Sequence, residues 1–266
     1  MTFSTLFLRG ANALVSFVVS VFLIVAGAYS VYALWDNEQI YAAADNVQAD
    51  MIKLKPKVTV SADSEEEEEE GASFDELLAI NKDVRAWVTV DNTNVDFPVV
   101  QGEDNLSYIN TDIYGNFALA GSIFLDSRNA PDFSDRYSLL YGHHMANSGM
   151  FGDLDLFKEE RFFADNRTGM LILPDRAYNL EIYACLLVKA SEDNIFEPEA
   201  VSGDLNKLYT FCEENAMFYR AETIEAARND PKSKTLALST CSSEFTDART
   251  IVLAVMKPYH AGETGG

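Results

Sequence analysis

The sequence has 266 residues, and its content of 48% hydrophobic and 12% aromatic residues excludes a disordered chain. Its 42 acidic residues against 20 basic ones give a net charge of −22, without a lysine and arginine cluster that could bind a phosphate backbone. Nucleic acid is therefore excluded as a partner. Three cysteines are too few, and odd in number, for a disulfide scaffold.

The first element expected along the chain is a membrane-spanning helix. Ala11–Leu34 carries no charged residue, and it exceeds the roughly 20 residues that a helix needs to cross a bilayer. Arg9 precedes this stretch and acidic residues follow it, so the positive-inside tendency predicts a cytoplasmic N-terminus and an extracellular chain after Asp36. The alternative is a cleaved signal peptide, for which residues 42–44 offer a weak small-residue cleavage site.

The next segment, residues 36–72, is polar and acidic. It contains an unbroken run of glutamates from Glu65 to Glu70. Like charges at neighbouring positions repel, which predicts an extended, solvated spacer between the membrane and a domain. A calcium-binding role for the glutamates is the alternative.

From Ser73 the sequence becomes globular. Ser73 and Glu76 have the spacing of a capping box, which predicts a short helix at the start of the domain. After Asp83 the chain consists mainly of short runs rich in β-branched and aromatic residues, separated by turn formers, and such runs are typical of strands. Apolar positions in Asp204–Tyr219 recur at helical spacing, which predicts one late helix. About eight strands with one late helix favour a closed β-barrel carrying an inserted helix.

Two segments carry residues that could perform chemistry. In the first, a predicted strand ends at Cys241, and Arg249 opens the next strand. If these strands pair as a hairpin, the permanently charged guanidinium would favour a thiolate, or an oxyanion formed by its attack. In the second, an apolar strand runs directly into His143 and His144. Cysteine, histidine and arginine together can serve acyl transfer as nucleophile, proton donor and charge stabiliser.

Structural interpretations compete with these catalytic ones for the cysteines. Cys185 lies inside an apolar strand and Cys212 on the apolar face of the late helix, so both are expected to be core residues. Cys241 differs because polar residues flank it, which places it at a strand end. The sequence has no spacing typical of a zinc site and no Gly-rich phosphate loop, so neither a metal nor a cofactor is expected.

The histidines and the arginine have alternatives of their own. Adjacent residues of an extended chain point to opposite faces, so at most one of His143 and His144 can serve the site. Arg249 could instead form a surface ion pair with Asp247 or Glu244.

The motifs resemble those of the sortases, specifically class B. LSTCSSEFTDARTIVLA is similar to the family's active-site strand and arginine strand, and YGHHMANSGMFGDL is similar to the class B histidine segment. VVQGEDNLSYIN and GSIFLD resemble its substrate-groove strands, and the helix at residues 204–219 lies where class B carries an insertion. Ser242 stands where some members have an acidic residue, so the resemblance supports a Cys–His–Arg set only. It covers residues 73–260 and implies a closed eight-stranded sortase-type β-barrel with an N-terminal helix and a helix inserted before the active-site strand.

The resemblance also implies roles for individual residues. Cys241 would attack the carbonyl of a Thr–Gly bond in the C-terminal sorting signal of a secreted protein. His143, which follows the glycine, would protonate the leaving amine and deprotonate the incoming one, while Arg249 would hold the substrate backbone and the oxyanion. An amine of a peptidoglycan precursor or of a pilin subunit would then release the acyl-enzyme. The residues implied to line the peptide groove are Asn105, Ile109, Tyr141, Ser239 and Thr240.

Two other classes of function remain open, a hydrolytic cysteine peptidase and a non-catalytic surface β-domain tethered to the membrane. Wall anchoring and pilin polymerisation are likewise both open. The expected organisation is a cytoplasmic N-terminus, a single transmembrane anchor, an acidic linker, an extracellular catalytic domain and a tail, at residues 1–10, 11–35, 36–72, 73–260 and 261–266.

Overall fold

The computed structural model describes residues 3–57, 74–241 and 247–259, and for residues 3–9 and Cys241 it describes the backbone alone. The chain divides into two compact units, Met1–Ala43 and Ala44–Gly266. The glutamate run at residues 65–70, the proposed cap Ser73 and the tail at residues 261–266 lie outside the described residues.

The helix α1 spans Phe3–Ile52, and from Gly10 onward it is long and apolar enough to cross a membrane. The expectation of an extended chain from residue 36 is wrong for residues 36–52, which are helical. This stretch is rich in alanine and other good helix formers and lacks glycine and proline, and the helix ends shortly before Pro56. The acidic character that suggested an extended segment comes largely from the glutamate run further along the chain.

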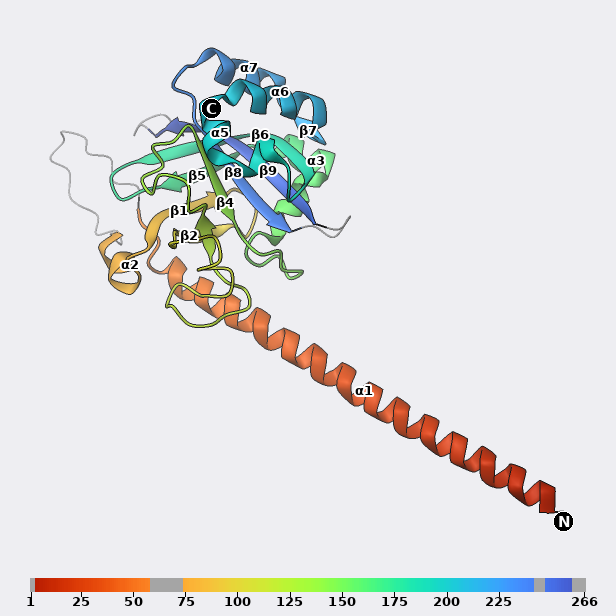
Figure 1. Ribbon diagram of the computed structural model, residues 1–266. Coiled ribbons are helices and arrows are strands. Elements are labelled where there is room, and N and C mark those ends of the chain that lie inside the picture. Colours follow the sequence, from red (N-terminus) through yellow and green to blue (C-terminus); the bar gives the residue numbers. More distant parts are fainter. Residues whose placement is uncertain (1–2, 58–73, 242–246, 260–266) are drawn as a thin grey trace. The chain divides into compact units, whose positions relative to one another are not determined.

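The described part of the second unit is built on a nine-stranded sheet, eight strands of which form a closed barrel (Figure 1). In the order β5-β1-β2-β3-β4-β8-β9-β6 each strand pairs with the next, and β5 pairs with β6 to close the ring. The predicted closed eight-stranded barrel is therefore confirmed. The strand bounds are β1 Val84–Val90, β2 Asp96–Val100, β3 Ile123–Leu125, β4 Tyr137–Tyr141, β5 Thr168–Ile172, β6 Ala177–Lys189, β7 Phe218–Tyr219, β8 Thr235–Cys241 and β9 Ala248–Pro258.

Two neighbouring pairs in the barrel, β2 with β3 and β4 with β8, are parallel, and the other pairs are antiparallel. The strand β4 is buried at every position from Tyr137 to Leu140, in keeping with a largely apolar sequence that is interrupted by Ser138. Because β4 and β8 run in the same direction, their C-terminal ends reach the same rim of the barrel.

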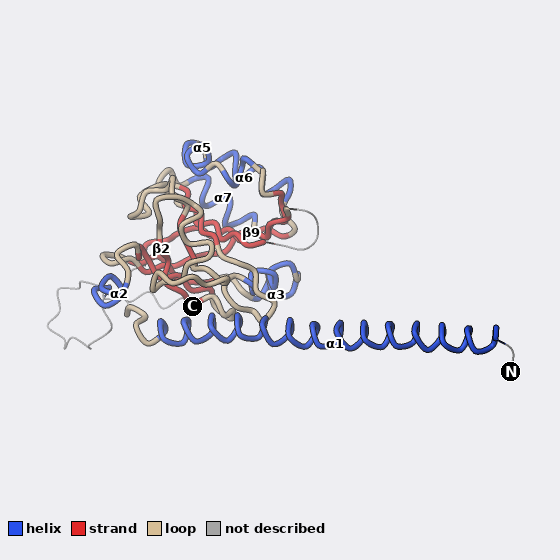
Figure 2. Tube along the Cα trace, turned by 60° about the horizontal axis from the view of Figure 1, so that its bottom comes forward, coloured by secondary structure: helices blue, strands red, loops and turns tan. Residues whose placement is uncertain are grey.

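Short helices cover the strands, and the predicted helix at the start of the domain is present as α2. Figure 2 shows α5, α6 and α7 gathered over one side of the strands. The helix bounds are α2 Phe74–Ile80, η1 Gly152–Lys158, a 3₁₀ helix, α3 Glu160–Asp165, α4 Asp193–Phe196, α5 Pro198–Gly203, α6 Leu205–Asn215 and α7 Ala221–Asn229.

The prediction of one late helix over residues 204–219 is only partly correct. The helix α6 begins after Asp204, whose side chain accepts a hydrogen bond from the Asn206 amide, and it ends at Asn215. Phe218–Tyr219 then forms the strand β7, which pairs with β6 outside the ring. The apolar spacing that suggested a longer helix included Tyr219, which lies on β7 and is 43% exposed, so it does not continue the buried face of α6. The helices η1, α3, α4, α5 and α7 were not predicted.

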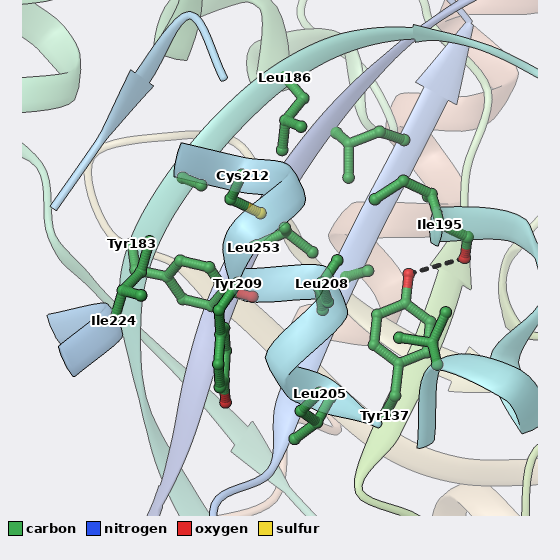
Figure 3. Packing of buried hydrophobic residues seen from close by; sticks show 14 of the residues in the cluster. Tyr137, Tyr183, Leu186, Ile195, Leu205, Leu208, Tyr209, Cys212, Ile224 and Leu253 are labelled. Carbon is green, nitrogen blue, oxygen red and sulfur yellow. Dashed lines mark hydrogen bonds between the residues drawn. The ribbon is translucent and has the colours of Figure 1, made fainter. Parts of the chain in front are cut away.

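The inserted helix α6 docks on the barrel through a buried apolar cluster (Figure 3). Leu208 and Cys212 of α6 are buried in the same cluster as Tyr183 and Leu186 of β6. The Tyr137 hydroxyl of β4 donates a hydrogen bond of 2.8 Å to the Ile195 carbonyl oxygen of α4. The barrel and its helical insertion therefore share one core.

Candidate active site at the rim of the barrel

The strands that carry the predicted catalytic residues are neighbours in the barrel. Tyr141, the last residue of β4, pairs with Ser239 of β8, and Cys241, the last residue of β8, pairs with Arg249 of β9. The predicted pairing of the cysteine strand with the arginine strand is confirmed. The side chain of Cys241 lies outside the described residues.

A groove with a volume of about 460 Å³ opens beside these strand ends. Every predicted peptide-lining residue, together with His143 and Arg249, contributes to its wall. The remaining wall residues were not predicted: Leu106, Phe124, Arg128, Gly142, Ala190, Phe196 and Glu197. The groove thus combines apolar walls with a few polar and charged side chains, as peptide-binding and small-molecule sites commonly do.

His143 is half-buried in the groove and is held by a main-chain carbonyl. Its Nε2 atom lies 2.8 Å from the Ile109 carbonyl oxygen. A carbonyl oxygen only accepts hydrogen bonds, so this contact places a proton on Nε2. Nδ1 is then the ring nitrogen that this contact does not occupy. Gly121, which has a positive φ of 60°, lets the chain pass close to that carbonyl, because a Cβ there would collide with the Ile109 oxygen.

His144 has different surroundings. It is exposed, and its Nε2 atom lies 3.1 Å from Oδ2 of Asp155 in η1. Asp155 also accepts a hydrogen bond of 2.8 Å from the Thr250 hydroxyl of β9. The adjacent histidines therefore have separate sets of partners, and of the two only His143 lines the groove.

Arg249 is half-buried, and its Nη1 atom donates a 2.9 Å hydrogen bond to the Ala248 carbonyl oxygen. No carboxylate among the described residues forms an ion pair with it, so the alternative of a pair with Asp247 is not realised. Glu244 lies outside the described residues. Most of the donors of the guanidinium thus remain available to a ligand in the groove.

Two hydroxyl groups of the groove wall are buried without partners. Ser239 and Thr240 are each 1% exposed, and neither hydroxyl has a hydrogen-bond partner among the described residues. A buried polar group without a partner is unfavourable by about 1–3 kcal/mol, which a bound ligand could relieve.

The sequence interpretation missed a charged cluster that supports the wall of the groove. The Asp126 side chain is fully buried and pairs with Arg128, with an Nη2–Oδ2 distance of 2.9 Å. Burial acts to raise the pKa of the Asp126 carboxyl, but hydrogen bonds from Arg128 and Tyr141 outweigh it and hold that pKa below its ordinary value. An acidic residue directly after the fully apolar β3 was the available signal, since a strand rarely ends on a buried carboxylate without a partner.

The other two cysteines are confirmed as core residues. Both Cys185 and Cys212 are 0% exposed. Burial raises the pKa of the Cys185 thiol to about 12 and also raises the pKa of Cys212, so neither forms a thiolate readily. The described residues contain no group of three or more histidine, cysteine, aspartate or glutamate side chains that could hold a metal ion.

Comparisons with known proteins agree with this geometry. The family model of the sortase domain matches residues 88–257. Sortase B of Listeria monocytogenes is 30% identical over 151 residues, a match that covers 57% of this chain and 59%, less than two thirds, of that protein. Sortase B of Staphylococcus aureus is 26% identical over 220 residues, covering 82% of this chain and 87% of the relative.

A solved structure is similar as well. The crystal structure of a Streptococcus pyogenes class B sortase involved in pilus biogenesis shares 38% identity with a TM-score of 0.62, and the match covers 69% of this chain and 97% of that one. The family model alone covers more than half of the chain, and these relatives are all class B sortases. The chain therefore belongs to the sortase family, whose members are cysteine transpeptidases, and within that family to class B.

Proposed function

We propose that this protein is a membrane-anchored transpeptidase that cleaves the C-terminal sorting signal of secreted proteins at a Thr–Gly type bond. The observation that carries the proposal is the shared groove. His143, Arg249 and the two unpartnered hydroxyl groups of β8 line one cavity, and the backbone of Cys241 ends the same strand. A nucleophile, a proton carrier and a charge stabiliser at one rim are the parts that acyl transfer requires.

In the proposed reaction the Cys241 thiolate attacks the threonine carbonyl carbon and forms a tetrahedral oxyanion. Arg249, with its unpaired donors, stabilises this charge. Protonated His143 gives its proton to the leaving glycine nitrogen, the C–N bond breaks, and a thioester remains. An incoming amine loses a proton to the neutral histidine, attacks the thioester and releases the thiolate, forming a new amide. Because Nε2 of His143 is engaged by the Ile109 carbonyl, Nδ1 is the nitrogen that would exchange the proton.

The substrate and the acceptor follow from the class. The proposed donor is a peptide that lies along Asn105, Ile109, Tyr141, Ser239 and Thr240. The proposed acceptor is an amine of a peptidoglycan precursor or of a pilin subunit. The 38% identity with a sortase involved in pilus biogenesis supports including the pilin amine among the candidates.

The apolar part of α1 is the proposed single-pass anchor, with the N-terminus in the cytoplasm and the catalytic domain outside. Arg9 before the apolar stretch supports this orientation. Protease added to intact protoplasts should remove the catalytic domain. Protection of the domain until the membrane is permeabilised would contradict the orientation.

The enzymatic proposal is tested with an internally quenched peptide that carries a Thr–Gly sorting motif, together with an amine acceptor. Cys241→Ala should abolish turnover, whereas Cys185→Ala and Cys212→Ala, the matched controls, should keep turnover in their folded fraction. Full activity of the Cys241→Ala protein would exclude a cysteine mechanism and leave the non-catalytic β-domain.

Product analysis separates transfer from hydrolysis. A transpeptidase should convert most of the acyl-enzyme to the amide product once the amine acceptor is present. Hydrolysed peptide as the only product, at every acceptor concentration and with both acceptor types, would favour the hydrolytic peptidase.

A further inference from the structure

Beneath the groove lies a carboxylate that does not itself line it. The Asp126 side chain has no exposed surface, and its two oxygens accept five hydrogen bonds. The donors are the backbone amide, Nε and Nη2 of Arg128, the side-chain amide of Asn105 and the hydroxyl of Tyr141, at distances from 2.9 to 3.0 Å. Three side chains of the groove wall therefore depend on a single anion.

These three side chains come from different parts of the fold. Asn105 lies in the connection between β2 and β3, Arg128 follows β3, and Tyr141 ends β4. Arg128 extends the network further, because it donates to Glu197 and to the carbonyl oxygen of Phe196, the last residue of α4. The Asp126 carboxylate thus links groove residues of the β2–β3 connection with groove residues of the helical insertion.

The network also fixes which atoms face a ligand as donors and which as acceptors. The Tyr141 hydroxyl donates its only proton to Asp126, so its oxygen is left as an acceptor. The Asn105 amide nitrogen donates one proton to Asp126 while its oxygen accepts from the Ser127 amide, so one N–H remains as a donor. Burial and the neighbouring Asp126 charge raise the pKa of Tyr141, which keeps the hydroxyl protonated.

We propose that Asp126 is a positioning residue for the sorting peptide, because it presents the Tyr141 oxygen as an acceptor for a backbone N–H of the peptide and the free Asn105 N–H as a donor to the peptide. This inference rests on the proposed function. Asp126 does not touch the peptide or the reacting atoms, so it acts on peptide binding more than on the chemical step.

The first test is Asp126→Asn, which keeps the shape of the side chain but replaces one acceptor oxygen by a donor. The carboxamide nitrogen then faces hydrogen-bond donors at whichever of the two oxygen positions it occupies, so the side chains of Asn105, Arg128 and Tyr141 shift. We expect KM for the quenched sorting peptide to rise by about tenfold or more, with kcat per active site changed less than about threefold. Active sites are counted with an irreversible thiol label, so that a loss of folded protein does not imitate an effect on KM.

The matched control is Asp153→Asn. Asp153 is also buried, and its carboxylate accepts a hydrogen bond of 2.8 Å from the Asn94 amide, but it does not line the groove. We expect this variant to lower thermal stability without changing KM. A similar rise in KM in both variants would overturn the positioning role, as would an Asp126→Asn enzyme with KM within twofold of wild type.

The second test leaves Asp126 in place, so it remains decisive if Asp126→Asn does not fold. Each backbone amide of the peptide is replaced in turn by an ester, which removes one N–H. The peptide whose ester removes the N–H that Tyr141 accepts should have a raised KM with the wild type. The same ester should change KM little with Tyr141→Phe, which lacks the acceptor oxygen. Equal sensitivity of both enzymes at every position would overturn the inference while the proposed function stands. A wild type that turns over no sorting peptide would overturn both.

Discussion

Arg249 is a half-buried guanidinium in the groove, and the only described hydrogen bond that it donates goes to the neighbouring carbonyl of its own strand. Its remaining donors form a planar fork that can hold a backbone carbonyl and an oxyanion at once, which a compact ammonium cannot do. We therefore expect Arg249→Lys to lower turnover by about 10²–10³, the usual effect of losing one oxyanion donor. The measurement is steady-state transpeptidation alongside thermal melting.

Arg85 provides the control for this substitution. It is also half-buried, and it donates to main-chain carbonyls of Lys82 and Val84, but it does not line the groove. Arg85→Lys should keep wild-type turnover. A folded Arg249→Lys enzyme within about threefold of wild type would contradict the oxyanion role, because such a change corresponds to less than about 1 kcal/mol.

The two histidines make a second contrast between neighbouring residues. His143→Ala should lower turnover by about 10²–10⁴, the range expected for a lost general acid and base. His144→Ala removes an exposed contact with Asp155, which is worth about 0–1 kcal/mol, so its activity should stay near wild type. Peptide turnover and thermal melting of both variants show which histidine serves as the general acid and base. The reverse pattern would move the catalytic role to His144.

At the scale of elements, strands were more predictable than helices. The β8 sequence TLALSTC and the apolar run of β4 carry their own strand signal, and the hairpin of β8 and β9 follows from their closeness in sequence. The parallel pairing of β4 with β8 joins residues almost a hundred positions apart, and the family resemblance was needed to place them together. The short helices α3, α4 and α5 have at most six residues, so periodicity could not reveal them.

The candidate site was also predictable only where the signal is local in the sequence. The histidine, cysteine and arginine segments were visible because reactive residue types stood at strand ends. Asp126 was missed because its role depends on Asn105 and Tyr141, which converge only in the folded chain. Phe196 and Glu197 were missed because they belong to the helical insertion, whose short helices were not predicted.

The contact between the barrel and α4 gives a prediction for this element. Tyr137→Phe removes the donor to the Ile195 carbonyl in a buried setting, which typically costs about 1–2 kcal/mol. We expect Tm to fall by about 2–6 °C. Phe196, which follows Ile195 in the chain, lines the groove, so KM for the peptide should rise as well.

Tyr183→Phe is the control for this element. Tyr183 is buried in the same cluster (Figure 3), but its hydroxyl has no hydrogen-bond partner among the described residues. Removing that hydroxyl should leave Tm unchanged or raise it slightly, because a buried hydroxyl without a partner destabilises the folded state. Equal destabilisation by the two substitutions would show that the Tyr137 hydrogen bond does not stabilise the docking of α4.

At the scale of the whole molecule, the catalytic unit begins inside α1 and not after the acidic segment. Met51, in the last turn of that helix, is 2% exposed and packs in a core cluster with Trp87 and Leu77. The Gln48 side chain donates to the Asn94 carbonyl oxygen. The end of α1 is therefore part of the folded catalytic unit, which begins at Ala44.

This organisation predicts how the chain tolerates truncation. A protein that begins at Ala44 should melt like the catalytic unit of the full chain, whereas one that begins at Val58 should lose the Met51 packing and melt at a lower temperature. In the full chain, Met51→Ala should cost about 2–5 kcal/mol, which lowers Tm by about 5–15 °C. Ile52, the next residue, is 45% exposed, so Ile52→Ala should change Tm by no more than about 2 °C. If the protein that begins at Val58 melts with the one that begins at Ala44, the end of α1 does not contribute to the stability of the catalytic unit.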